Sequence, residues 1–373
     1  MNILRFNYIF YLYNCVKAGL IKPINFRLND CVLKMAAEIN FVVMGLGHIG
    51  KRHAEMVLRQ KGAHLVAFID CLSPDSLNLG DLASGIPHFY TFEEFLASGL
   101  QAQVLNVCTP NGLHAEHALA ALNEGLHVVI EKPMALHDAD CEILMAKASE
   151  KNLHIFTVMQ NRYSPPAVWI KEVIDSKIMG DLFLMQLDCY WNRDERYYTP
   201  NAWHGKKDLD GGTLFTQFSH FIDMMIWLFG DIKNIDAVFK NFNHAGLTEF
   251  EDSGFIRFEF EKSGMGLVNF STAVFEQNLS SSMTILSENG SVKIGGQYMN
   301  KVEHCRINNY QIPALVETAA GNNYGAYSGS AQNHHLVIEN VVRVLNGGEN
   351  LGSTAAEGSK VVATINKMYD ARK

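Results

Sequence analysis

The feature that most constrains this chain is a glycine-rich run, GLGHIG, that stands between two patterned segments. The apolar segment Phe41–Met44 before it is typical of a buried strand, and His48–Gln60 after it has the pattern of a helix. A second apolar run, Leu65–Ile69, ends at Asp70, about 20 residues after the glycine run. A strand, a glycine turn, a helix and an acidic residue in this order predict a dinucleotide-binding Rossmann domain.

Each part of this motif has a physical role in holding the cofactor. Glycines let the backbone turn tightly and approach a pyrophosphate, and the following helix N-terminus offers free N–H groups. Asp70 can accept hydrogen bonds from the adenosine ribose hydroxyls, and its charge would repel a 2′-phosphate. Because no arginine follows Asp70 to compensate, the sequence favours NAD over NADP. The predicted contacts of this motif are Gly45, Gly47, His48, Ile49, Gly50 and Asp70.

Two hydrophobic patterns divide the chain near residue 158. Up to there, short apolar runs alternate with helical stretches, which predicts a parallel sheet. From Met159 on, segments such as Leu182–Tyr190 and Gly254–Phe260 alternate apolar and polar residues, as one-sided antiparallel sheets do. We expect an α/β chain with an N-terminal extension (1–38), a Rossmann domain (39–158) and a substrate-binding and oligomerisation α+β domain with a large, mostly antiparallel open sheet (159–373). Sequence alone does not place the last helix, Ala355–Arg372, which could pack back on the Rossmann domain.

Charge and cysteine usage exclude some classes of partner. The formal net charge is −8 and no basic stripe is present, so we expect no nucleic-acid partner. The apolar segment Tyr8–Cys15 is too short to span a bilayer, and we expect no membrane partner. The seven cysteines are scattered without a CxxC pair, which is typical of reduced thiols in a cytoplasmic protein, and no metal is expected. Residues before Met35 fit the rest poorly, so we interpret them as an upstream extension, with a genuine N-terminal arm as the alternative.

A second motif, Glu131-Lys132-Pro133, follows an apolar run at the carboxyl end of a predicted parallel strand. Ligands gather at that edge of such sheets. Lys132 could donate a hydrogen bond to a substrate hydroxyl there and stabilise alkoxide character. The tripeptide taken by itself would equally indicate an ordinary lysine that faces solvent after a strand.

A third motif, Asp210–Asp223, begins with Asp210-Gly211-Gly212 and runs into Thr213–Phe229. We predict Thr213–Phe229 to be one helix with Thr216, His220 and Asp223 on one face. An imidazole titrates near neutrality, so His220 could take the hydroxyl proton during oxidation. A lone histidine on a helix is more often structural, and the apolar neighbours show that much of this helix is core.

Taken together, the motifs resemble the Gfo/Idh/MocA oxidoreductase family, over nearly everything from Ile39 to the C-terminus. The resemblance implies that Lys132 and His220 are catalytic. It also implies cofactor contacts at Thr109, Pro110, His114 and Glu131. One departure matters: many members carry aspartate four residues before the histidine, where this chain has Thr216, so proton transfer would depend more heavily on His220 and Lys132.

Other segments resemble the WlbA/WbpB-like branch, which oxidises UDP-N-acetylhexosaminuronates at the 3-position in surface-polysaccharide synthesis. Arginines and lysines (Arg162, Arg193, Arg196, Lys206, Lys207) are interleaved with aromatics (Tyr163, Trp191, Tyr197, Tyr198, Trp203). Such cations could pair with a diphosphate and a carboxylate, and the aromatics could flank a uracil or a sugar. Alternatively, several of the cations pair with Asp194, Glu195 and Asp208 on the surface. The predicted substrate contacts are Gln160, Asn161, Arg162, Tyr198, Trp203, Thr216, Gln217 and Asn333.

The branch resemblance further implies a small-molecule nucleotide-sugar substrate, NADH reoxidised in place by 2-oxoglutarate, and a tetramer or dimer joined through the second-domain sheet. Three alternatives stay open: a dehydrogenase of free sugars or cyclitols, an NAD-dependent glycosidase, and a non-catalytic NAD-sensing regulator. A regulator has no need of both Lys132 and His220, so their presence argues against that class.

Overall fold

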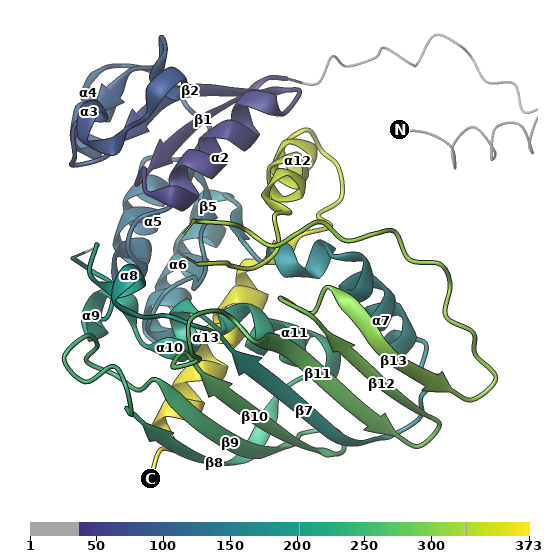
Figure 1. Cartoon of the computed structure of the whole chain (residues 1–373). Helices are drawn as coiled ribbons and strands as arrows, with labels where there is room; N and C mark the ends of the chain where they lie inside the picture. The colour runs from purple at the N-terminus through teal and green to yellow at the C-terminus, as the bar shows by residue number, and fades with distance from the viewer. Residues whose placement is uncertain (1–36, 201, 326) are drawn as a thin grey trace, which may run out of the picture. The chain divides into compact units, whose positions relative to one another are not determined.

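The computed structural model describes residues 37–200, 202–325 and 327–373. Residues Glu38–Lys373 form one unit with two seven-stranded sheets (Figure 1). The predicted N-terminal extension, 1–38, lies outside the described residues apart from its last two.

The first sheet has the strand order β14-β6-β5-β4-β1-β2-β3. Its strands are β1 (Ile39–Met44), β2 (Ala63–Ile69), β3 (His88–Phe89), β4 (Val104–Val107), β5 (His127–Ile130), β6 (Ile155–Thr157) and β14 (Ser353–Thr354). All neighbours pair in parallel except β14, which pairs antiparallel with β6. The parallel strands are connected by helices, as the alternating pattern predicts.

Side chains of these strands alternate between two hydrophobic cores. Phe41 and Val43 of β1 face the layer that contains α2 and α12, whereas Val42 and Met44 face the layer that contains α5 and α6. All four are buried, which explains why β1 reads as a continuous apolar run rather than an alternating one. The helices between and after these strands are α2 (His48–Arg59), α3 (Pro74–Leu77), α4 (Phe92–Ala97), α5 (His114–Asn123), α6 (Asp138–Lys151) and α12 (His334–Leu345), with 3₁₀ turns at η1 (Gly80–Ala83), η2 (Asn111–Leu113) and η3 (Gln160–Tyr163).

The second sheet has the order β13-β12-β11-β7-β10-β9-β8. Its strands are β7 (Leu182–Tyr190), β8 (Ile232–Lys240), β9 (Ser253–Phe260), β10 (Met265–Ser271), β11 (Ser280–Ser287), β12 (Gly290–Gly295) and β13 (Lys301–Ile307). Only the β7–β10 pair is parallel, so the prediction of a mostly antiparallel sheet is confirmed. Helices cover one face and the other face is open (Figure 1). The remaining helices are α7 (Pro165–Asp175), α8 (Glu195–Tyr198), α9 (Lys207–Asp210), α10 (Thr213–Thr216), α11 (Ser219–Phe229) and α13 (Ala355–Asp370).

Two elements differ from or extend the sequence-based expectations. The single helix predicted over Thr213–Phe229 is wrong, because it is divided into α10 and α11. Phe218 between them has φ −118° and ψ 3°, outside the helical region, so the helix is interrupted there. The last helix, α13, contacts α6 and β6 beside the first sheet as well as α11 and β8 beside the second. No helix in the described part of the chain is long and apolar enough to cross a membrane.

Candidate active site

The glycine turn after β1 has the local geometry that a bound phosphate group requires. Gly45 has φ +85°, and a side chain there would meet the Cys108 carbonyl oxygen at 2.6 Å. A side chain at Gly50 would collide with the backbone of Gly45. Around Gly47, in contrast, nothing lies within 4 Å of where a side chain would begin, so its outer surface is open to a ligand. Gly45 and Gly50 are therefore required by close packing, whereas Gly47 leaves space for a ligand.

The N-terminus of α2 is available for an anion. Gly47 is the N-cap of this helix, and no side chain caps it. Uncapped N–H groups and the positive end of the helix dipole favour a phosphate there. Leu46 N–H donates to Asp70 Oδ2 at 2.6 Å, and Leu72 N–H donates to Asp70 Oδ1 at 2.9 Å, so the carboxylate is held beside the turn. These residues fit a dinucleotide.

The loops after β4 and β5 are joined at the same sheet edge. The His114 ring lies between two carbonyl oxygens, with Nδ1 2.7 Å from Pro133 O and Nε2 2.8 Å from Thr109 O. The Thr109 hydroxyl also lies 2.9 Å from His117 Nδ1. His114 thus joins the segment with Thr109 and Pro110 to the loop with Lys132. Together the two loops form one wall at the carboxyl ends of the strands.

Glu131 is buried in a cluster with two histidines, His53 and His334, whose ligand atoms all lie within 4.8 Å of one another. Such a set could hold a metal ion, but hydrogen bonds already account for most of it. The Asn106 amide donates to His53 Nδ1 at 3.0 Å, so His53 Nε2 carries the proton that it donates to Glu131 Oε1 at 2.9 Å. Burial alone would raise the pKa of Glu131, but the hydrogen bond from His53 and the nearby His334, at 3.5 Å, hold that pKa well below its usual range.

Lys132 and His220 lie together beside this cluster. The Lys132 Nζ donates to the Thr216 carbonyl oxygen at 2.7 Å. Burial lowers the pKa of Lys132, while the charges of Glu131 and Asp210 act in the opposite direction. Both ring nitrogens of His220 are buried without a hydrogen-bond partner among the described residues. Burial, and next the charge of Lys132, hold the pKa of His220 well below its ordinary value.

Asp210 is a buried carboxylate that sequence reasoning missed. It accepts a hydrogen bond from Gly205 N–H at 2.7 Å and another from the Thr216 hydroxyl. Asn111 completes the group by donating to the Thr216 hydroxyl at 2.6 Å. Burial raises the pKa of Asp210 to about 6, against the opposite influence of these bonds and of Lys132. Asp210 directly precedes the Gly-Gly pair, but no sequence pattern indicates that its side chain reaches Thr216.

Three of the predicted substrate residues hold η3 and the start of α12 together. The Gln160 carbonyl accepts a hydrogen bond from Asn333 Nδ2 at 3.2 Å. Asn161 Oδ1 accepts one from the Ser330 hydroxyl at 2.9 Å. Gln160 Oε1 and Asn161 Nδ2 are buried without a partner among the described residues, so each retains an atom that a ligand could satisfy.

Arg162 does not lie free for a substrate. It makes a two-point contact with Asp223, at 2.8 and 2.6 Å, and an ion pair with Glu357. Its guanidinium also stacks over Trp227, 5.0 Å from the ring centroid. The Arg162 charge is therefore paired within the protein. Asp223 forms this pair from α11, the helix that also carries His220, whereas Thr216 lies on the separate helix α10.

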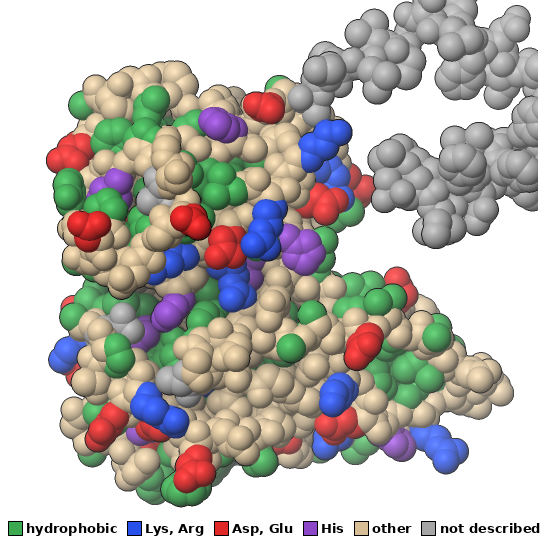
Figure 2. Space-filling model, turned by 45° about the horizontal axis from the view of Figure 1, so that its top comes forward, with side chains coloured by type: hydrophobic (Ala, Val, Ile, Leu, Met, Phe, Trp, Pro, Cys, Tyr) green, Lys and Arg blue, Asp and Glu red, His purple; other side chains and the backbone are tan. Residues whose placement is uncertain are grey.

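The other predicted cations are mostly engaged as well. Arg193 is buried, donates to Gln217 Oε1 at 2.7 Å and packs against Trp191 and Tyr327. Arg196 pairs with Asp194 at 2.6 Å on the surface, as the alternative interpretation predicted. Cationic side chains and histidines gather where the upper and lower parts of the described unit meet (Figure 2).

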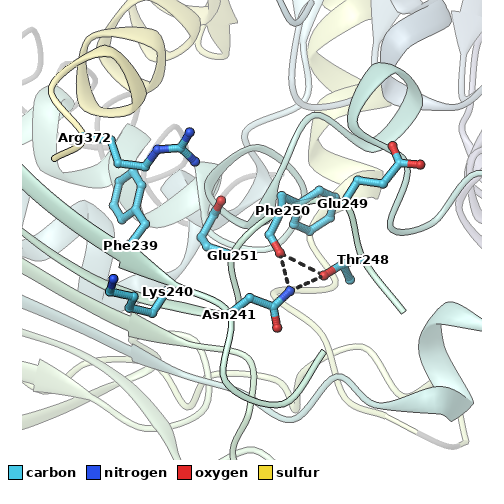
Figure 3. Close-up of a pocket in the computed structure, with 8 residues that line it drawn as sticks. All are labelled: Phe239, Lys240, Asn241, Thr248, Glu249, Phe250, Glu251 and Arg372. Carbon is cyan, nitrogen blue, oxygen red and sulfur yellow. Dashed lines mark hydrogen bonds between the residues drawn. The ribbon is translucent and has the colours of Figure 1, made fainter. Parts of the chain in front are cut away.

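The two predicted lysines lie apart from Lys132 and His220. Lys206 pairs with Glu249 at 3.0 Å, and Lys206 and Lys207 line a groove of about 1080 Å³. A neighbouring groove of about 300 Å³, at the end of α13, shares Glu249 and Arg372 with it (Figure 3). Neither groove is lined by the two predicted catalytic residues.

An aromatic cluster bridges the second-domain loops and the glycine turn. Tyr197 stacks on His204 with ring centroids 4.2 Å apart, and Tyr198 packs edge-on against Tyr197. Trp203 is partly exposed and contacts His204. The Tyr324 ring lies 5.4 Å from that of His48, at the start of α2. The segment that contains Tyr324 therefore reaches the predicted cofactor site.

This fold and site define a class: an oxidoreductase with an NAD-binding Rossmann domain followed by a large-sheet α+β domain. Family models confirm it. Residues 39–159 match "Oxidoreductase family, NAD-binding Rossmann fold", and residues 168–293 match "GFO/IDH/MocA C-terminal domain". The chain belongs to the Gfo/Idh/MocA oxidoreductase family, as its motifs predicted.

Relatives of known name or structure agree with this membership. The chain is 25% identical over 205 residues to "Oxidoreductase P35" of Formosa agariphila, a match that covers 54% of this chain and 64%, less than two thirds, of that protein. The WlbA dehydrogenase of Bordetella pertussis, solved with NADH and UDP-GlcNAcA, is 28% identical with a TM-score of 0.79, covering 90% of this chain and 96% of that one. The WlbA dehydrogenase of Chromobacterium violaceum, solved with the same ligands, is 26% identical with a TM-score of 0.79, covering 94% and 95%.

Proposed function

We propose that this chain oxidises a sugar hydroxyl with NAD, and that the substrate is a UDP-N-acetylhexosaminuronate oxidised at its 3-hydroxyl. The observation that carries the proposal is the buried His220, whose two ring nitrogens have no partner among the described residues and whose pKa is lowered by burial and by the nearby charge of Lys132. A buried histidine without a partner is costly unless a ligand completes it.

The cofactor contacts proposed are those of the glycine turn and of the wall formed by Thr109, Pro110, His114 and Glu131. NAD, when bound there, supplies the hydride acceptor. His220 takes the proton of the substrate hydroxyl through one of its free ring nitrogens. Lys132 keeps two N–H donors after its bond to the Thr216 carbonyl and can direct one at the same hydroxyl oxygen. Its positive charge stabilises the alkoxide character that develops there.

Several observations support the nucleotide-sugar assignment. Two WlbA dehydrogenases with UDP-GlcNAcA bound are similar to this chain over most of its length. Gln160 and Asn161 each have a buried polar atom left for a ligand, and Tyr198, Trp203, Gln217 and Asn333 are the further contacts proposed. Thr216 would act from beside Lys132. Reoxidation of NADH by 2-oxoglutarate and a homo-oligomer, dimer or tetramer, joined through the open face of the second sheet remain part of the proposal.

The test is NADH formation with a panel of substrates. The full chain is mixed with NAD and UDP-N-acetylglucosaminuronate, UDP-N-acetylglucosamine, glucose or inositol, each with and without 2-oxoglutarate. The uronate should support the highest rate. The variants Lys132→Met and His220→Asn should lose activity, whereas Lys147→Met, at a partly exposed lysine of α6 that pairs with Glu150, should not. Activity confined to the free polyols would refute the nucleotide-sugar assignment alone.

A dehydrogenase of free sugars is the second candidate, and one observation favours it. Arg162, Arg193 and Arg196 are engaged with protein groups, which leaves fewer free cations for a diphosphate than the sequence suggested. The substrate panel distinguishes the two candidates directly.

A further inference from the structure

Where many family members carry an aspartate, this chain has Thr216. The carboxylate of another residue, Asp210, lies against the Thr216 hydroxyl. Asp210 lies six residues earlier in α9, is almost completely buried, and accepts the proton of the Thr216 hydroxyl. Its other oxygen accepts the Gly205 N–H at 2.7 Å. Both carboxylate oxygens are therefore fixed by neighbouring backbone and side chain.

The direction of the hydrogen bonds follows from the donors present. Asn111 Nδ2 has only protons to offer, and it lies 2.6 Å from the Thr216 hydroxyl oxygen, so that oxygen accepts from Asn111. The hydroxyl proton of Thr216 then points to Asp210, whose carboxylate Oδ1 and carbonyl oxygen, at 2.8 Å, both lie within hydrogen-bond reach. The Asp210 carbonyl also accepts from Asn111 at 2.8 Å, which ties Asn111 to both ends of the segment.

The other polar group of Thr216 faces Lys132. Its carbonyl oxygen accepts the Lys132 Nζ at 2.7 Å, the one hydrogen bond of that ammonium to the described residues. The charged groups that act on Lys132 are Glu131 and Asp210, which favour its charged form, and Arg193, which opposes it. Glu131 is already engaged with His53 and His334, so Asp210 is the carboxylate on the substrate-domain side.

We propose that Asp210 is a positioning residue of the active site: its carboxylate, bonded to the Thr216 hydroxyl, holds the Lys132 ammonium in place and keeps it charged. The inference rests on the proposed function in one respect, the role of Lys132 in catalysis. Its physical content, an interaction between Asp210 and Lys132, does not depend on which substrate is used.

The charge of Lys132 can be measured without any turnover. Only a neutral amine reacts with an acylating or reductive-methylation reagent, so the labelling rate of Lys132 at fixed pH, followed by mass spectrometry of its peptide, reports the neutral fraction. Removing a nearby opposite charge shifts a pKa by about one unit or more, and one unit changes the neutral fraction about tenfold. Asp210→Asn should therefore raise the labelling rate several-fold to about tenfold.

Matched variants separate this effect from loss of structure. Asp208→Asn removes an exposed carboxylate of the same short helix and should leave the labelling of Lys132 unchanged. Thr216→Val removes only the connecting hydroxyl and should raise the labelling rate by less than Asp210→Asn does. NAD affinity and thermal unfolding are measured for each variant, and if Asp210→Asn does not fold, Thr216→Val decides the question by the same readout.

The outcomes are distinct. Faster labelling in Asp210→Asn and Thr216→Val, restored toward the original rate in Asp210→Glu, supports the proposal even if no tested sugar is oxidised. Unchanged labelling in folded, NAD-binding variants overturns it and leaves Asp210 with a purely structural role. Where turnover is measurable, kcat should fall with little change in KM, because Lys132 is misplaced while the substrate contacts remain.

Discussion

Replacing Arg162 tests whether this residue holds the protein together or contacts the substrate. The side chain of Arg162 is 10% exposed and that of its partner Asp223 is 1% exposed. Arg162→Met keeps most of the apolar stem but removes the charge, which leaves the Asp223 carboxylate buried without a counter-charge. Glu357 is less affected, since it is 34% exposed and keeps its capping-box bonds to Thr354 at the start of α13.

The expected cost follows from the burial of the pair. Removing one partner of a buried ion pair costs about 3–5 kcal/mol, because the remaining charge is uncompensated. With a urea slope of about 3 kcal/mol/M, the unfolding midpoint should fall by about 1 M or more. The double variant Arg162→Met, Asp223→Asn should be less destabilised than Arg162→Met alone, since no buried charge is left. Arg196→Met, which breaks an exposed pair with Asp194, should cost less than about 1 kcal/mol.

The assay is urea unfolding followed by intrinsic fluorescence, together with steady-state kinetics below the transition. A large loss of stability in Arg162→Met with a recovery in the double variant would support the structural role. A normal unfolding midpoint together with a large rise in the KM of the substrate would refute this reasoning and restore the predicted substrate contact.

The remaining predictions concern the chemistry, the cofactor and the N-terminal residues. Lys132→Met and His220→Asn should each lower turnover by about 100- to 10,000-fold with NAD affinity nearly intact; a His220→Asn enzyme with over about a tenth of the activity would contradict the assignment. Because burial and Lys132 lower the pKa of His220, and its imidazole must be neutral to accept a proton, the acidic limb of the pH–rate profile should lie below the ordinary histidine pKa and move upward in Lys132→Met. Titrations should show that the chain binds NAD more tightly than NADP, and Asp70→Ala should reduce this difference in affinity. Equal affinity of the unmutated chain for the two cofactors would contradict the prediction. A chain beginning at Met35 should match the full chain in melting temperature and NAD affinity, and a large loss of either would show that the earlier residues matter.

The Rossmann part was predictable because its constraints are local. Glycines with a positive φ or no room for a side chain, such as Gly45 and Gly50, leave a spacing that survives in sequence. Fully buried parallel strands likewise give apolar runs, as in β1. Strands β8, β12 and β13 were missed because an open sheet with one exposed face needs few apolar residues, and β13 has one buried side chain, Ile307.

The site was predictable only where a motif carried it. Lys132 and His220 belong to motifs with a defined spacing, and their catalytic roles stay predictions. The partner of Arg162 could not be inferred, since Asp223 and Glu357 lie 61 and 195 residues away in the chain. Asp210 was missed for a related reason: the group that joins it to Thr216 includes Asn111, which lies 99 and 105 residues away from them in the chain.

The most direct test of the central claim follows one hydrogen atom. UDP-N-acetylglucosaminuronate carrying deuterium at C3 is incubated with the full chain and NAD, and the mass of the nicotinamide product and of the sugar nucleotide is measured. The account predicts deuterated NADH and a 3-keto sugar nucleotide without deuterium, and both should form far more slowly with His220→Asn. Unlabelled NADH, or a sugar nucleotide that keeps its deuterium in the presence of active enzyme, would contradict oxidation at the 3-hydroxyl.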